Sequence, residues 1–172
     1  MTIFSFNETQ RFRQPWIWVL LLAILMLFGW AFIQQIVMGI PWGNNPTSDY
    51  VFLLFCIIPV SLIALFLILR LDTQIDETGV YYRYFPLHFK KRKIDWSEID
   101  DAHIRKYKPI SEYGGWGIRY GFKGGVAYNV SGKSGLQLKL IDGKRLLIGT
   151  QKPKEIELLL KSLKEKTKIF ET

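Results

Sequence analysis

Residues whose types and spacing could bind phosphate lie in the stretch "EYGGWGIRYG" (112–121). Four glycines surround a tryptophan and an arginine there, and a glycine-rich loop can cradle an anion on its backbone amides. The G-x-G-x-x-G pattern of dinucleotide-binding loops is not met, because Tyr120 stands at its last position, and no helix pattern follows to lend its N-terminus. The sequence therefore disfavours a phosphate loop at this place.

The same stretch is better interpreted as a β-strand with one bare face. At a period of two, Trp116, Ile118 and Tyr120 share one face, and the glycines share the other with Arg119. The next strand, "VAYNV" (126–130), alternates in the same way. Glycine in a strand marks either a bend or a close approach of another chain. Two interpretations stay open: a bend that curls the sheet, or a shallow docking groove formed by Gly115, Gly117, Arg119, Ala127 and Asn129.

The strongest charged feature is the basic run "HFKKRK" (88–93), whose cations are Lys90, Lys91, Arg92 and Lys93. Positive side chains on a strand edge discourage pairing with other chains. The same side chains could instead contact anionic lipid headgroups. Both interpretations remain open at this point.

No constellation typical of an enzyme accompanies these stretches. His88 and His103 have no nearby cysteine and no H-E-x-x-H spacing, and neither a G-x-S-x-G nor a P-loop pattern occurs. The acidic residues from Asp95 to Asp101 lack the spacing and turn glycine of a calcium loop. Asp95 with Glu98 resembles a helix capping box instead. We therefore expect no catalytic residue, no metal ion and no cofactor.

Two long apolar stretches, 16–37 and 50–69, carry no charged side chain. Each is close to the ~20 residues of helix that cross a bilayer. Tryptophan and tyrosine lie near their ends, at the expected level of the lipid headgroups. Two buried core helices would need more surrounding chain than remains, and the apolar region of a cleaved signal peptide is shorter, about 7 to 15 residues. The pattern predicts a transmembrane hairpin with a short external loop, 38–49.

Charge predicts the orientation of this hairpin. Arg11 and Arg13 precede the first span and Arg70 follows the second, whereas the loop 38–49 has no Lys or Arg. We therefore expect a multi-pass protein of the cell membrane. The positive-inside rule places both of its termini in the cytoplasm. The net charge of +8 falls on residues 70–172, because the charges before Arg70 cancel. Such a domain is attracted to an anionic membrane surface, and no nucleic-acid-binding motif is present.

After Arg70 the chain breaks into eight short runs rich in β-branched and aromatic residues, which predicts a mainly antiparallel β domain of about seven or eight strands. The best-specified hairpin is "LQLKLIDGKRLLIG" (136–149). A three-residue turn with Gly143 as a left-handed bulge puts its leucines on one face, and burial should favour this register over a two-residue turn. We expect a positive φ at Gly143 and a buried Leu146.

The last element is predicted to be an amphipathic helix, "PKEIELLLKSLKEK" (153–166), with an apolar stripe of Ile156, Leu159, Leu160 and Leu163. The predicted organisation is thus an N-terminal segment, a first span, an external loop, a second span and a cytoplasmic β domain with a C-terminal helix: 1–15, 16–37, 38–49, 50–69 and 70–172. The N-terminal segment could lie at the membrane interface or add an edge strand to the domain.

This arrangement resembles the bacterial pleckstrin-homology-like membrane proteins. The residues that carry the resemblance are "DETGVYYRYF", "IDWSEIDDAHIRKY" and "LIDGKRLLIGTQKPKEIELLL", within residues 70–165. Ile94, Trp96, Glu98 and Ile99 match the I-x-W-x-E-I turn of that family. The resemblance implies a small, strongly bent sheet closed by the C-terminal helix, and it implies no enzymatic activity.

We therefore expect a non-enzymatic integral membrane protein that presents a basic domain at the cytoplasmic membrane face for protein interaction or scaffolding. The alternative is a sensor of anionic lipid surfaces that uses residues 90–93. The expected partners are membrane lipids and an unidentified protein, and not nucleic acid. The oligomeric state does not follow from the sequence.

Overall fold

The computed structural model describes residues 5–121 and 125–170, with side chains as far as residue 164. These residues form two compact units. The first unit comprises residues 12–68 and contains the two apolar helices. The second comprises the strand that ends at Arg11 together with the chain from Leu69 onward, and it contains the β structure.

The helical unit is a pair of apolar helices joined by a short connection. Its elements are α1 (Pro15–Phe32), a π-helical turn that continues it (Ile33–Val37), and α2 (Asp49–Ile68). The Phe12 and Phe66 rings meet edge to face at one end, with centroids 5.3 Å apart. At the other end the Gln35 amide donates to the Thr47 carbonyl oxygen and to the Asp49 carboxylate, each at 3.0 Å. Both helices are long and apolar enough to cross a membrane, as the sequence predicted.

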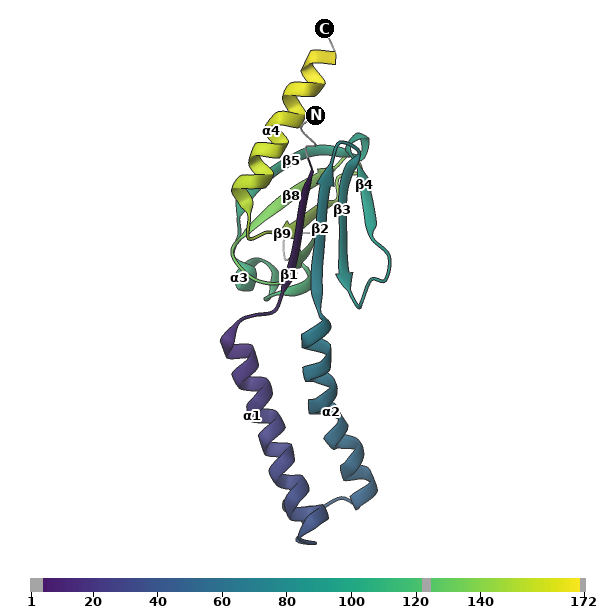
Figure 1. The fold of residues 1–172 in the computed structure, drawn as a ribbon, viewed down its shortest axis with the longest axis vertical. Helices are drawn as coiled ribbons and strands as arrows, with labels where there is room; N and C mark the ends of the chain where they lie inside the picture. The colour runs from purple at the N-terminus through teal and green to yellow at the C-terminus, as the bar shows by residue number, and fades with distance from the viewer. Residues whose placement is uncertain (1–4, 122–124, 171–172) are drawn as a thin grey trace. The chain divides into compact units, whose positions relative to one another are not determined.

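The β unit holds two sheets (Figure 1). The first sheet has the order β1-β2-β3-β4, made of β1 (Phe6–Arg11), β2 (Arg70–Asp76), β3 (Gly79–Phe85) and β4 (Arg92–Asp95). The second has the order β5-β8-β9-β7-β6, made of β5 (Ile99–Lys106), β6 (Gly117–Tyr120), β7 (Val126–Asn129), β8 (Ser134–Leu140) and β9 (Arg145–Gly149). Neighbouring strands are antiparallel except β7 and β9, which are parallel. Each of the eight predicted strand segments overlaps one of the strands β2 to β9.

The core lies between the inner faces of these sheets. Alternation along β2 buries Leu71, Thr73 and Ile75, as the period of two of a strand requires. The Tyr82 ring of the first sheet meets the Tyr128 ring of the second with centroids 4.9 Å apart. Larger side chains that are completely or almost completely buried fill the remaining space, among them Val80, Tyr84, Leu136, Leu138 and Ile148.

Strand β1 makes the N-terminal segment part of the β unit. It pairs with β2 from Phe6 opposite Ile75 to Arg11 opposite Arg70, so residues 6–11 form the edge strand and not an interfacial segment. The Gln10 side chain also donates from Nε2 to the Gly149 carbonyl oxygen of the second sheet, at 2.6 Å. The β domain is therefore interrupted in sequence by the apolar helices, whereas the sequence pattern predicted that it starts at residue 70.

The predicted hairpin register is confirmed by the pairing of β8 with β9. Leu138 lies opposite Leu146 and Leu136 opposite Ile148. Gly143 has a φ of 82°, and Leu146 is buried. The reason is the one expected: this register turns Leu136, Leu138, Leu146 and Ile148 toward the core, while Leu147 lies on the outer face.

Two shorter connections and a long helix complete the domain: a 3₁₀ turn (Trp96–Glu98), α3 (Pro109–Tyr113) and α4 (Pro153–Phe170). The 3₁₀ turn has the predicted capping box, in which the Asp95 backbone N–H donates to the Glu98 carboxylate at 3.0 Å. Helix α4 contacts β1, β5 and β8, and its predicted stripe is buried at Ile156, Leu159 and Leu160.

Gly79 and Gly143 both have a positive φ, but only one is sterically enclosed. A Cβ at Gly79 would lie 2.3 Å from the Ile94 carbonyl oxygen, whereas a Cβ at Gly143 would meet no atom within 4 Å. We expect Gly143→Ala to lower the free energy of unfolding by ~1 kcal/mol through backbone strain, and Gly79→Ala by ~3 kcal/mol because overpacking adds to it. Urea unfolding of the detergent-solubilised protein measures both. Equal losses would contradict this difference.

Candidate functional site

The second sheet turns its outer face away from the first sheet, and α3 covers part of it. Tyr107, which precedes α3, and Tyr113, the last residue of α3, form a buried cluster with Ala127 of β7 and Leu147 of β9. Burial raises the pKa of Tyr107 to about 12, so its phenol is neutral at pH 7. The rest of the outer face, over β5, β8 and the start of β9, stays open.

This cover overturns the docking groove predicted on the glycine-rich hairpin. These residues do share one face of the β6–β7 hairpin, as predicted, because Gly117 pairs with Asn129 and Arg119 pairs with Ala127. However, Ala127 and Asn129 have no exposed surface, and the Asn129 side chain accepts a hydrogen bond from the Gly117 N–H at 2.8 Å. Gly115 and Gly117 have φ values of 123° and 117°, which matches the interpretation as a bend. A partner could not reach the floor of the predicted groove.

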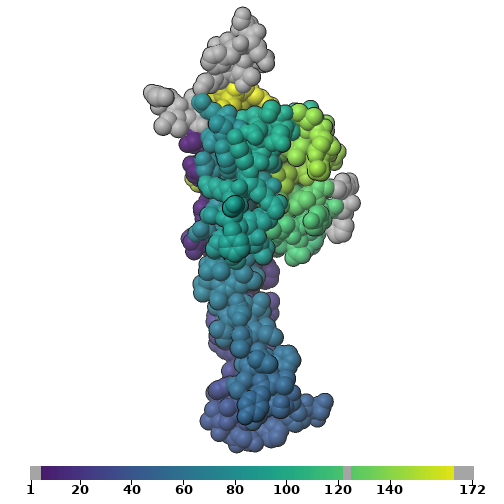
Figure 2. Space-filling view, turned by 90° about the vertical axis from the view of Figure 1, so that its right-hand side faces the viewer, coloured from purple at the N-terminus to yellow at the C-terminus, as the bar shows by residue number. Residues whose placement is uncertain are grey.

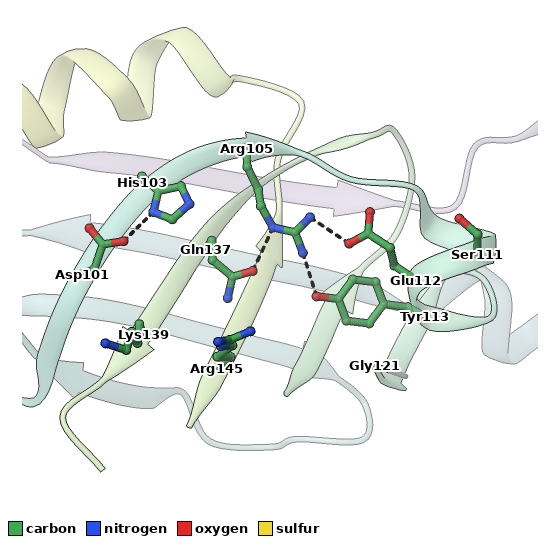
Figure 3. A pocket seen from close by; sticks show the side chains of 10 residues that line it. All are labelled: Asp101, His103, Arg105, Ser111, Glu112, Tyr113, Gly121, Gln137, Lys139 and Arg145. Carbon is green, nitrogen blue, oxygen red and sulfur yellow. Dashed lines mark hydrogen bonds and ion pairs between the residues drawn. The ribbon is translucent and has the colours of Figure 1, made fainter. Parts of the chain in front are cut away.

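The open part of the same face forms a pocket of about 410 Å³ (Figure 3). Its walls come from β5, β8, β9 and α3. Strand alternation on β5 brings Asp101, His103 and Arg105 to this face, while Ala102 between them is buried. Figure 3 shows these side chains converging with Gln137 on the sheet.

Arg105 is the central side chain of the pocket. Its guanidinium donates from Nε to Gln137 Oε1 at 2.9 Å, from Nη1 to Glu112 Oε2 at 2.8 Å and from Nη2 to the Tyr113 hydroxyl at 3.0 Å (Figure 3). The other Glu112 oxygen accepts from the Lys108 N–H at 2.7 Å. Charge-assisted hydrogen bonds of this kind are the strong ones. Arg105 therefore attaches α3 to β5 and β8 and sets the shape of the pocket.

The remaining ionisable groups line the open side. His103 Nδ1 lies 2.6 Å from the Asp101 carboxylate, and Lys139 Nζ lies 2.5 Å from the Asp100 carboxylate. Arg145 is exposed, and among the described residues its side chain makes no hydrogen bond or ion pair. The pocket thus has a rigid charged wall at Arg105, an ion-paired Lys139 and an accessible cation at Arg145.

The Asp101–His103 pair does not extend into a catalytic triad. Ser111 lines the same pocket, but Figure 3 shows it at the opposite end from His103, with Arg105 between them. A nucleophile and its base must lie within hydrogen-bond reach. Over the described residues, no group of three His, Cys, Asp or Glu side chains is arranged to hold a metal ion. The arrangement is suited to binding a charged group.

The pocket was not found from the sequence, although one signal for it was present. The alternation of charged and apolar residues in "DAHIRK" (101–106) indicates a strand with Asp101, His103 and Arg105 on one face. The partners of Arg105 lie elsewhere in the chain, on β8 and α3, so no local pattern could reveal the contact.

The structure separates the four cations of the predicted basic run. Lys90 and Lys91 lie on the exposed β3–β4 loop, where Lys91 Nζ donates to the Gln74 side chain at 2.8 Å. Arg92 and Lys93 belong to β4. Arg92 donates to the Tyr128 hydroxyl at 3.2 Å, and Lys93 contacts the Asp95 carboxylate at 2.5 Å. All four side chains are exposed, but Lys90 and Lys91 lie on the loop, whereas Arg92 and Lys93 lie on β4 and are bonded to Tyr128 and Asp95.

His88 precedes this run on the same loop and does not add to its charge. Burial and the nearby Arg92 charge lower its pKa. A histidine whose pKa is lowered below the ordinary value of about 6.5 is neutral at pH 7.

Fold and site together define a class of protein with two apolar helices, each able to span a membrane, and a β domain of two sheets and a C-terminal helix with a charged surface pocket. The sequence model of a family of unknown function, DUF6141, matches residues 2–164. The chain belongs to this family. No curated protein matches it.

Replacing Arg105 tests its role as the attachment of α3. Arg105→Ala leaves Glu112 and Gln137 without their donor, and we expect it to lower the free energy of unfolding by about 2–3 kcal/mol. Arg105→Lys should recover only part of this loss, because an ammonium cannot make three divergent hydrogen bonds in one plane. The matched control Arg145→Ala should stay within about 0.5 kcal/mol of the wild type. Denaturant unfolding measures all three, and equal stability of the two alanine variants would refute the role.

Proposed function

We propose that the chain is an integral protein of a bacterial cell membrane that crosses the bilayer twice, with both termini in the cytoplasm. The length and apolar character of α1 and α2 support this. Most of their side chains are exposed in the described chain, as lipid-facing side chains would be. Arginine at positions 11, 13 and 70 and the lack of Lys and Arg in residues 38–49 support the orientation.

The β domain is proposed to be a pleckstrin-homology-like domain without enzymatic activity. Two packed sheets followed by the amphipathic helix α4 support the first part of this proposal. The separation of Ser111 from the Asp101–His103 pair supports the second part, because hydrolytic chemistry of that type needs the three groups in contact.

The proposed role of the domain is to bind a protein partner at the membrane, and the pocket beside Arg105 is the observation that carries it. The pocket is concave and open, and its shape is held by the satisfied Arg105 guanidinium. A preformed site of this kind with a few well-placed polar groups is typical of recognition. Arg145 at its open side favours a partner segment that carries a carboxylate.

Site-specific photo-crosslinking in native membranes tests this role. A crosslinking residue at Ser111, on the rim of the pocket, should capture one protein species, whereas one at the exposed Leu158 of α4 should not. Arg145→Glu should abolish the product by repelling a carboxylate. The matched control is Lys144→Glu, which changes the same charge at the adjacent residue outside this pocket. The role is refuted if position 111 gives no product above position 158, or if Arg145→Glu leaves the product unchanged.

A further inference from the structure

Strand register defines two ends of the β domain. Arg11, the last residue of β1, pairs with Arg70, the first residue of β2, and Arg70 also pairs with Phe85, the last residue of β3. The chain leaves toward α1 after Arg11 and returns from α2 at Arg70. Both connections to the apolar helices therefore start from one end of the first sheet, which we call the helix-linked end. The β3–β4 loop (86–91) follows Phe85 and lies at this end as well.

The second sheet contributes further loops to the helix-linked end. Gln10, next to Arg11, is bonded to the carbonyl oxygen of Gly149, the last residue of β9. Gly149 pairs with Gly135 near the start of β8, and Gly135 pairs with Arg105 near the end of β5. The β7–β8 turn and α3, which follows β5, therefore lie at the same end. Figure 1 shows α3 and the β3–β4 loop beside the ends of β1 and β2 from which the helices continue.

Large apolar side chains on these loops are mostly exposed, although the Phe89 ring meets Phe85 edge to face. The exposed fractions are 61% for Leu87 and 77% for Phe89 on the β3–β4 loop, and 68% for Ile110 on α3. On α3 it is Tyr113, and not Ile110, that packs against the sheet. Leu87 and Phe89 follow Phe85, the residue at which the pairing of β3 with β2 ends. Uncovered apolar side chains gathered at one end of a domain mark a surface that binds something.

The charges of the domain are divided between its two ends. Exposed lysines accompany the apolar side chains at the helix-linked end: Lys90, Lys91, Lys108 and Lys133. The one acidic residue on the β3–β4 loop, the β7–β8 turn and the chain around α3 is Glu112, which is paired with Arg105. The opposite end carries acidic residues on the β2–β3 turn, around the 3₁₀ turn and on the β8–β9 turn: Asp76, Glu77, Asp95, Glu98, Asp100, Asp101 and Asp142. Lys93, Lys139 and Lys144 also lie at this end, each paired with one of these carboxylates, together with Arg145.

We infer that the helix-linked end of the β domain binds the anionic surface of the same membrane that holds α1 and α2. Leu87, Phe89 and Ile110 enter the interfacial layer, and the lysines beside them contact anionic headgroups. Apolar side chains flanked by lysine bind such surfaces both by burying apolar area and by electrostatic attraction to the headgroups. This inference rests on the proposal that the two helices span the membrane.

The continuity of the chain favours the membrane over a second protein as the occupant. One residue, Leu69, separates α2 from β2, so the helix-linked end cannot move far from the end of a spanning helix. The inference also divides the basic run that the sequence singled out. Lys90 and Lys91 face the lipid, whereas Arg92 and Lys93 are engaged within the domain by Tyr128 and Asp95.

Lipid quenching in nanodiscs tests the contact with the full chain. In a Cys56→Ser background, which removes the only native cysteine, Phe89→Cys or Leu87→Cys carries an environment-sensitive fluorophore. The matched control is Ile141→Cys, since Ile141 is 70% exposed on the β8–β9 turn at the opposite end. In discs containing phosphatidylglycerol we expect blue-shifted emission and quenching by spin-labelled lipid at positions 87 and 89, and neither effect at 141.

Charge reversal tests the electrostatic part of the contact. Lys90→Glu with Lys91→Glu should remove the quenching at position 89, whereas Lys144→Glu, an exposed lysine at the opposite end, should leave it unchanged. High salt and discs of phosphatidylcholine alone should weaken the quenching. Absence of quenching at 87 and 89, or equal quenching at 141, overturns the inference, as does protection of position 89 by a second copy of the chain or by another protein.

A separate labelling experiment distinguishes failure of this inference from failure of the membrane hairpin. In sealed vesicles, Asn45→Cys in the connection between α1 and α2 should react with an impermeant maleimide from the side opposite to Ile141→Cys. Labelling of both from one side overturns the spanning helices and the inference with them. Labelling from opposite sides without quenching at position 89 overturns the lipid contact alone.

Discussion

The antiparallel pairing of β1 with β2 joins segments that are separated in sequence by residues 12–69, and the rest of the architecture depends on it. Closing a long connection costs chain entropy, but here the connection is a helical hairpin whose own ends meet, with the Phe12 and Phe66 rings 5.3 Å apart. Once in place, β1 joins the two sheets through Gln10. The domain is therefore complete only when the chain on both sides of the apolar helices has been assembled.

Arg105 has a comparable role on the second sheet. Its hydrogen bonds to Gln137, Glu112 and Tyr113 hold α3 against β5 and β8, and α3 in turn brings Tyr113 over Ala127 and Leu147. One side chain thereby decides which half of the outer face is covered and which half is left as a pocket. A guanidinium can do this because its donors lie in one plane and diverge toward separate acceptors.

Topology also distributes the charges of the domain. Loops at the helix-linked end carry lysine, whereas the turns at the opposite end carry most of the carboxylates. In an antiparallel sheet, alternate turns fall at alternate ends, so the lysines of the β3–β4 loop and the carboxylates of the β2–β3 turn and the 3₁₀ turn lie at opposite ends. A net charge of +8 understates this separation, because it sums over both ends.

The sequence by itself determined the features that depend on local pattern. These include the two apolar helices, the strand segments of the β domain, the register of the hairpin at Gly143, the capping box at Asp95 and the buried stripe of α4. Each follows from periodicity, burial or turn chemistry over a few neighbouring residues. Only the tertiary structure decided that β1 belongs to the domain, that Ala127 and Asn129 are covered, and that Arg105 shapes a pocket with Gln137 and Glu112. Those features join residues far apart in the chain, and packing selects them among many pairings that the local pattern allows equally well.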